Sequence, residues 1–238
     1  LAGGVAVAVR TVLDARLHRR EQRRLTSTFG GYVSPQVLRA ILDGRVAAGG
    51  GRRHLAFLFA DLRGFTSLSE RAAPDAVLAL LNRYYAAITP VIHAQGGTID
   101  NFRGDGLMVM FGAPEAIERP ARAAVAAARA VCAAIDQLNQ ELVAEGQPPL
   151  ELALGVAAGD AVYGDLGSPD RKDYTALGDA VNVAARLQDV AKERGYALAL
   201  TREALSEAGI ETAGFDDLGD VELKGHSPVR VMGWGART

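Results

Sequence analysis

The sequence predicts an α+β fold in which helices cover one or both faces of a mainly antiparallel sheet. Apolar runs of strand length alternate along the chain with longer segments whose apolar residues recur at helical spacing. Two pairs of short apolar segments, within residues 98–112 and 220–234, are separated only by turns, which is typical of antiparallel hairpins. The regular strand, glycine-rich turn and helix of a dinucleotide-binding fold does not occur.

The expected elements begin near residue 52. Residues 54–62, HLAFLFADL, form an apolar run that indicates a buried strand. Residues 74–92 place their apolar residues on one helical face, and the Gly-Gly pair at 96–97 ends this helix. The remaining expected elements are a hairpin over 98–112, a long helix over 118–142, a strand over 151–159, a helix over 178–195, a strand over 197–201, a short helix over 202–209 and a final hairpin over 220–234.

The composition describes one sizeable globular domain plus an extension. The chain has 238 residues, of which 49% are hydrophobic and 23% are charged. Its formal net charge of -2 provides no basic field for nucleic acid, so we expect no nucleic-acid partner. The single cysteine excludes an internal disulfide framework, and the four histidines are too scattered for a zinc site.

The first 51 residues differ from the rest. Residues 1–9 are apolar but far shorter than the roughly 20 residues of a membrane-spanning helix, so we interpret them as the end of a transmembrane segment. Six arginines follow within residues 10–24, a pattern that places the downstream chain at the cytoplasmic face of the cell membrane. We therefore expect a juxtamembrane signalling helix and linker over 10–51, and an upstream membrane or sensor domain. A solvated helix face on a soluble protein explains these arginines equally well.

Two aspartates are expected at the ends of neighbouring buried strands. Asp61 ends the first expected strand, and Asp105 lies between two glycines at the tip of the hairpin. Turn geometry alone favours aspartate and glycine at such a tip. However, two carboxylates at the ends of neighbouring buried strands are costly without a cation between them. Mg²⁺ commonly binds one or two carboxylates together with substrate phosphates, which makes it the expected cofactor.

Four segments, in order, resemble the catalytic domain of class III nucleotidyl cyclases, of the membrane-attached bacterial adenylate cyclase type. FADLRGFTSLSE and NFRGDGLMVMFGAP resemble the two metal-binding segments of the family. DYTALGDAVNVAARL and LKGHSPVRV resemble its transition-state and phosphate-binding segments, and FGGYVSPQVLRAIL resembles a linker in membrane-attached members. The resemblance implies a ferredoxin-like, palm-type sandwich and a nucleotidyl cyclase catalytic domain over 52–238.

The resemblance also implies a reaction, the conversion of ATP to 3′,5′-cyclic AMP and pyrophosphate by two-metal-ion catalysis. Asp61 and Asp105 would hold two Mg²⁺ ions, for which Mn²⁺ can substitute. Asn182 would orient the ribose, and Arg186, four residues later on the same helical face, would stabilise charge at the α-phosphate. Lys224 matches the family's phosphate-binding lysine.

Four further residues are expected to bind the substrate: Phe65 and Thr66 after the first metal aspartate, and Asn101 and Thr175 at the two base-reading positions. Adenylate cyclases of this family commonly carry lysine at the position of Asn101, and guanylate cyclases carry glutamate. An amide and a hydroxyl can pair with either purine, so neither position selects the base by charge. Arg103 stands where an apolar residue is commoner.

In this family the active site lies between two catalytic domains, which implies a two-fold homodimer. Each site would combine Asp61 and Asp105 of one subunit with Asn182, Arg186 and Lys224 of its partner. A guanylate or mixed-specificity cyclase remains an alternative, and so does a catalytically silent cyclase-homology regulatory module. The presence of all five residues argues against the silent module. A diguanylate cyclase is disfavoured because the hairpin reads RGDGL instead of GGDEF or GGEEF.

Overall fold

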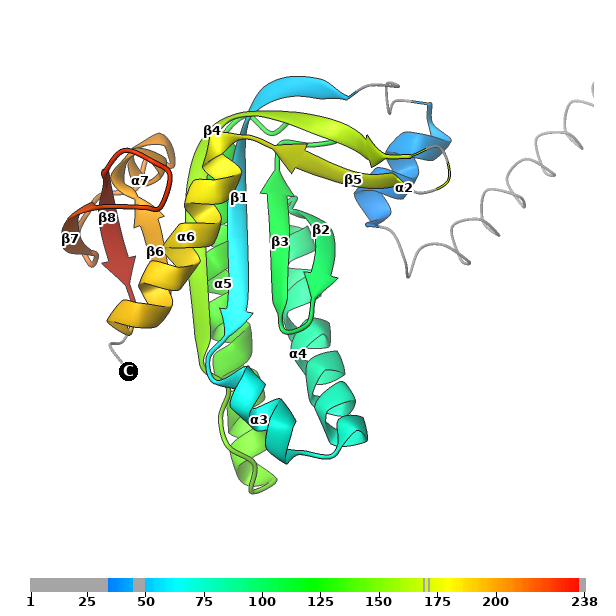
Figure 1. The fold of residues 1–238 in the computed structure, drawn as a ribbon, viewed down its shortest axis with the longest axis vertical. Helices are drawn as coiled ribbons and strands as arrows, with labels where there is room; N and C mark the ends of the chain where they lie inside the picture. Colours follow the sequence, from blue (N-terminus) through cyan, green and yellow to red (C-terminus); the bar gives the residue numbers. More distant parts are fainter. Residues whose placement is uncertain (1–33, 45–49, 169, 171, 236–238) are drawn as a thin grey trace, which may run out of the picture. The chain divides into compact units, whose positions relative to one another are not determined.

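The computed structural model describes residues 34–44, 50–168, 170 and 172–235 of the chain (Figure 1). The chain divides into two compact units, Leu1–Ala47 and Ala48–Thr238. The expected membrane segment end at 1–9 and the signalling helix up to residue 33 lie outside the described residues. Within the described residues, no helix combines the length and apolar character that crossing a membrane requires.

The first unit contains helix α2 (Pro35–Leu42). Proline is favoured in a first helical turn because its missing N–H would have no partner there. Arg39 Nε donates to the carbonyl oxygen of Pro35, one turn earlier, at 3.1 Å. Helix α2 lies within the segment 10–51, where a signalling helix and linker were expected.

The second unit is built on a sheet that has eight strands among the described residues. The strand order is β2-β3-β1-β4-β6-β8-β7, and β5 also pairs with β4. All pairings are antiparallel except that of β4 with β6, which is parallel. The strands are β1 (Gly51–Leu62), β2 (Thr98–Arg103), β3 (Gly106–Phe111), β4 (Leu152–Gly167), β5 (Lys172–Leu177), β6 (Leu198–Thr201), β7 (Asp216–Val221) and β8 (Val229–Trp234).

Helices cover both faces of this sheet, so the α+β architecture with a mostly antiparallel sheet is confirmed. Figure 1 shows α6 in front of the sheet and α5 behind it. The core divides accordingly, because α4 and α5 pack in one apolar cluster and α6 packs in another. The helices are α3 (Phe65–Arg71), α4 (Pro74–Ala94), α5 (Pro120–Ala144), α6 (Asp179–Arg194) and α7 (Arg202–Glu207).

The central strand β1 is buried on both faces, which explains its continuous apolar run. Ala56 and Leu58 belong to the cluster with α4 and α5, whereas Leu55 and Phe57 belong to the cluster with α6. Side chains alternate along a strand, so Asp61 has the same parity as Phe57 and lies on the α6 side. The position of this carboxylate therefore follows from the core pattern of the strand.

The close packing of α6 on β4 depends on a glycine. A Cβ atom at Gly155 would lie 2.1 Å from the carbonyl oxygen of Ala184 and 2.3 Å from the backbone nitrogen of Gln188. Both atoms belong to the backbone of α6 and cannot move aside as a flexible side chain could. Glycine at this position therefore allows the helix backbone to approach the sheet.

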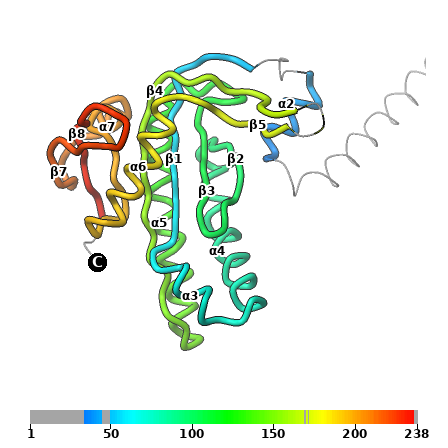
Figure 2. Tube along the Cα trace, in the orientation of Figure 1, coloured from blue at the N-terminus to red at the C-terminus, as the bar shows by residue number. Residues whose placement is uncertain are grey.

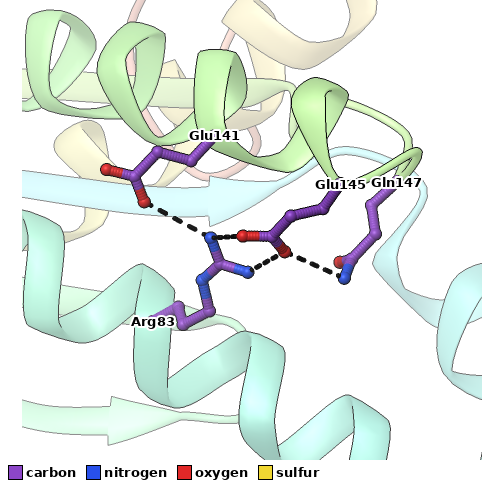
Figure 3. Close-up of polar contacts among 4 residues, drawn as sticks. All are labelled: Arg83, Glu141, Glu145 and Gln147. Carbon is purple, nitrogen blue, oxygen red and sulfur yellow. Dashed lines mark hydrogen bonds and ion pairs between the residues drawn. The ribbon is translucent and has the colours of Figure 1, made fainter.

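Helices α4 and α5 are also joined by charged side chains (Figure 3). Arg83 on α4 donates to both carboxylate oxygens of Glu145, at 2.6 and 3.0 Å, and to Glu141 on α5 at 3.3 Å. The Arg83 hydrogen bond lowers the pKa of Glu145 below its ordinary value. These groups are exposed, so solvent screens their attraction, and the buried apolar face dominates the packing of the two helices.

Three elements differ from the sequence-based expectation. Helix α3, which follows Asp61, was not among the expected elements. Strand β7 begins at Asp216, before the expected hairpin. The largest difference is the long pair of β4 and β5, because no strand was expected over Lys172–Leu177 and β4 continues to Gly167. Much of this ribbon is exposed, including Val162 and Leu177, so it lacks the buried run that marks a core strand.

Candidate active site

The two predicted metal aspartates are neighbours. Asp105 lies in the turn between β2 and β3, and the pairing of Ala60 with Leu107 places this turn beside the end of β1 (Figure 2). A Cβ atom at Gly106 would lie 3.4 Å from Asp61 Oδ1, so a residue without a side chain suits this approach. Tyr85 on α4 fixes the turn by donating its hydroxyl to the carbonyl oxygen of Gly104 at 2.6 Å.

The electrostatics of this pair fit a bound cation. Burial and the neighbouring carboxylate of Asp61 raise the pKa of Asp105 to about 6. Two neighbouring carboxylates repel each other when both are ionised, and a positive charge between them stabilises the ionised pair. Among the described residues there is no group of three or more His, Cys, Asp or Glu side chains that could hold a metal. An ion at Asp61 and Asp105 would therefore need further oxygen ligands, which substrate phosphates and water can supply.

A lysine already neutralises part of this charge. Lys192, near the end of α6, donates from Nζ to Asp61 Oδ2 at 2.7 Å. The guanidinium of Arg63 positions this helix end by donating to the carbonyl oxygens of Lys192, Ala191 and Tyr196 at 2.6, 2.9 and 2.6 Å. The carbonyl oxygen of Ala191 also accepts from the backbone N–H groups of Gly195 and Tyr196, so Arg63 adds to the hydrogen bonds around this helix end. Neither Arg63 nor Lys192 could be identified from the sequence, because neither contact is visible from local spacing.

A second set of predicted residues lines one cavity of about 330 Å³. Asn101 comes from β2, Thr175 from β5 and Asn182 from the first half of α6, so three separate elements meet there. The cavity combines an apolar part with several polar groups, as small-molecule sites usually do. Its other lining residues include Phe59, Asp100, Arg103, Met108, Asp173 and Val181.

A β-bulge explains why two consecutive residues of β2 line this cavity. The register of β2 against β3 shifts between Ile99 and Phe102. Regular alternation would turn Asp100 and Asn101 to opposite faces, but a bulge locally changes the direction of side chains. Asp100 was therefore not identified from the sequence, where alternation gives no sign of the shift.

Two hydrogen bonds organise the polar groups of the cavity. Thr175 Oγ1 donates to Asp100 Oδ2 at 2.9 Å, and Arg103 Nε donates to Asn101 Oδ1 at 3.1 Å. Burial raises the pKa of Asp100, while the hydrogen bond from Thr175 and the charge of Arg103 oppose this rise. Both residues predicted to read the base are thus held by a second side chain.

The other predicted residues lie outside the cavity lining. Arg186 is half-exposed and forms an ion pair with Asp189 at 3.6 Å. Lys224 is exposed in the turn that follows β7. The same turn is tied to the beginning of α6, because His226 Nε2 lies 2.7 Å from Asp179 Oδ2.

Phe65 and Thr66 begin the short helix α3, four and five positions after Asp61. Phe65 packs against the α4 and α5 side of the core, and Thr66 is exposed. Neither residue is part of the lining of the cavity that contains Asn101.

The chain matches a known protein family and solved structures of the same fold. Residues 51–234 match the family described as the adenylate and guanylate cyclase catalytic domain. The crystal structure of the guanylyl cyclase Cya2 is similar, with a TM-score of 0.70 and 36% identity over 78% of this chain and 93% of that one. The crystal structure of the adenylyl cyclase CyaB from P. aeruginosa has a TM-score of 0.72 and 35% identity over 78% of this chain and 95% of that one.

A curated relative extends the comparison to a longer protein. The uncharacterized protein Rv1318c of Mycobacterium tuberculosis is 36% identical over 214 residues, which cover 89% of this chain. The matched region is only 38% of that relative's length.

Proposed function

Because the chain belongs to the family of adenylate and guanylate cyclase catalytic domains, we propose that it converts ATP to 3′,5′-cyclic AMP and pyrophosphate. In this reaction the ribose 3′-oxygen forms a bond to the α-phosphorus, and the bond from that phosphorus to the pyrophosphate oxygen breaks. The hydroxyl proton leaves to solvent. The protein must therefore hold the base, the ribose and the triphosphate in one geometry.

We propose a homodimer because Asn182 and the residue that contacts Asp61 lie far apart along α6. Lys192, which contacts Asp61, lies ten residues after Asn182 on the same helix. At 1.5 Å per residue this corresponds to about 15 Å. The ribose and the α-phosphate are adjacent groups of one nucleotide, so Asn182 and Asp61 of the same chain are poorly placed to act on them together. Two chains related by a two-fold axis would supply both sets to each of two equivalent sites.

The chain's own residues would divide the work within each site. Asn182 would orient the ribose, and Asn101 and Thr175 would contact the base in the cavity that the three residues line. The Arg186 side chain is 49% exposed and its ion pair with Asp189 is loose at 3.6 Å, so the guanidinium can turn to the α-phosphate of a nucleotide. Lys224 would contact the outer phosphates as a mobile positive charge.

Asp61 and Asp105 of the partner chain would hold the divalent ions, as Mg²⁺ or Mn²⁺. When bound, such ions lower the pKa of the 3′-hydroxyl and neutralise the triphosphate and the leaving pyrophosphate. The adjacency of the two carboxylates and the raised pKa of Asp105 support this assignment. We further propose that the domain works at the cytoplasmic face of the cell membrane below a sensor domain, which the arginines of residues 10–24 support.

Product identification tests the proposed function. The chain is incubated with Mn²⁺ or Mg²⁺ and either ATP or GTP, and the products are identified by mass spectrometry. We expect cyclic AMP and pyrophosphate in equal amounts, with the Asp61→Ala variant as the inactive control. Cyclic GMP as the main product would identify a guanylate cyclase, and no cyclic nucleotide from either substrate would favour the silent regulatory module.

A further inference from the structure

We infer that Asp100 and Arg103 fix the hydrogen-bond polarity of the base pocket, so that it favours adenine over guanine. Both line the same cavity as the base-reading residues, and each contacts a different one of them. The inference rests on the proposed function and deepens it by assigning two positioning residues for base selection.

Asp100 determines what Thr175 can offer to a base. A hydroxyl has one donor hydrogen and two acceptor lone pairs, and an ionised carboxylate can only accept. Thr175 therefore uses its hydrogen on Asp100 Oδ2, 2.9 Å away. Its oxygen then faces a ligand as an acceptor. The bulge between Ile99 and Phe102 allows Asp100 and Asn101, although consecutive, to line the same cavity.

Arg103 determines what Asn101 can offer. The guanidinium has only donors, so the amide oxygen of Asn101 must be the atom that accepts from Arg103 Nε at 3.1 Å. This contact opposes a flip of the amide, because a flip would bring two donors together. The amino group of Asn101 then remains as the donor for a ligand. The unusual arginine of this hairpin thereby has a physical role.

An acceptor beside a donor matches one purine edge. Adenine presents a donor at its N6 amino group and an acceptor at N1, whereas guanine presents an acceptor at O6 and a donor at N1. Thr175 as acceptor and the Asn101 amino group as donor pair with adenine at both positions. With guanine, acceptor would face acceptor and donor would face donor. Unpaired polar groups in a site reduce binding of the wrong ligand.

The test compares kcat/KM for ATP and GTP in the full chain and in two variants. Asp100→Asn keeps the shape but can donate to Thr175, which frees the hydroxyl hydrogen for guanine O6. Arg103→Met keeps an unbranched stem but lets the Asn101 amide turn. In each variant we expect the ATP/GTP ratio of kcat/KM to fall about threefold to tenfold, as expected for one hydrogen bond. Partial unfolding of a variant would lower kcat for ATP and for GTP by the same factor. It therefore cannot by itself produce the expected fall in the ratio.

Matched controls separate polarity from charge. Asp173→Asn removes a carboxylate from the same cavity without removing the partner of Thr175, and Arg52→Met removes an exposed arginine outside it. Both should keep the wild-type ratio. Inosine triphosphate, which has the O6 and N1 pattern of guanine but lacks its 2-amino group, should behave like GTP. Three results would each overturn the inference. The ratio could stay unchanged in Asp100→Asn and Arg103→Met, it could fall equally in the two controls, or the chain could use inosine triphosphate as it uses ATP.

A binding measurement keeps this test independent of turnover. The dissociation constants of 3′-deoxy-ATP and 3′-deoxy-GTP, which lack the attacking hydroxyl, should differ in favour of adenine. Their ratio should fall in the same two variants. If the chain forms no cyclic nucleotide, the proposed function fails, while this ratio still decides whether Asp100 and Arg103 set the base polarity.

Discussion

Lys192 Nζ on α6 lies 2.7 Å from Asp61 Oδ2 at the end of β1. The side chains of Lys192 and Asp61 are 40% and 25% exposed, so solvent screens the pair only in part. The ammonium group partly neutralises a carboxylate that the proposed function assigns to divalent ions. Metal binding and this ion pair should therefore compete for Asp61.

Lys192→Met should strengthen binding of Mn²⁺, because it removes the competing positive charge. A partly exposed ion pair is worth up to about 1 kcal/mol, which corresponds to about fivefold in affinity. Titration of Mn²⁺ in the presence of 3′-deoxy-ATP, followed by electron paramagnetic resonance, measures this without turnover. Lys172→Met removes a looser ion pair on β5 at 3.8 Å and should leave the affinity unchanged. Weaker Mn²⁺ binding in Lys192→Met would contradict competition between Lys192 and the metal for Asp61. It would indicate that Lys192 supports metal binding instead.

Arg63→Met should lower the free energy of unfolding by about 1–3 kcal/mol, because three hydrogen bonds to carbonyl groups at the end of α6 are lost. Urea denaturation measures the difference. Arg194→Met is the matched control, since Arg194 donates one exposed hydrogen bond, to Leu218, at 3.1 Å. Its effect should stay within about 0.5 kcal/mol. Equal effects in the two variants would show that Arg63 does not fix the helix end.

His54 should make a small pH-dependent contribution to stability. The hydrogen bond to Glu207, 2.8 Å away, raises the pKa of His54 above its ordinary value of 6.5, and Asp160 adds to the rise. A raised pKa in the folded state gives stability that is fully present below the unfolded value and is lost as pH rises through the folded value. Because these groups are partly exposed, we expect less than about 1 kcal/mol.

The comparison of wild type with His54→Gln by urea denaturation checks this sign. The wild type should be the more stable protein at about pH 5.5, and the difference should shrink by about pH 8.5, where the imidazole is neutral. Glu207→Gln should reduce the same pH dependence. A difference that grows with rising pH would show that His54 is not stabilised in its charged form by Glu207.

Local patterns in the sequence predict the core of this fold well. The apolar run of β1 and the helical periodicity of α4 each have one dominant signal, and the structure confirms both elements. The ribbon of β4 and β5 could not be predicted in the same way, because its exposed residues carry no burial pattern. The motifs also led to the neighbouring carboxylates of Asp61 and Asp105 and to three residues that line one cavity.

The residues that hold the predicted site residues in place were not predictable. Asp100 and Asn101 line the same cavity because of a bulge in β2, which leaves no mark in the alternation of the sequence. Lys192 reaches Asp61 across 131 positions of sequence, and Arg63 reaches Tyr196 across 133. Contacts of this range depend on the packing of α6 against β1, so they require the tertiary structure.

Mixing two inactive variants tests most directly the central claim that each active site is shared between two chains. Asp61→Ala lacks a proposed metal ligand, and Arg186→Ala lacks the group proposed to stabilise the α-phosphate, so each protein alone should be nearly inactive. In a heterodimer one site carries both lesions and the other carries neither. After subunit exchange, confirmed by labelling, activity should return to at most about half that of wild type per heterodimer. Confirmed exchange with no return of activity would contradict the shared site.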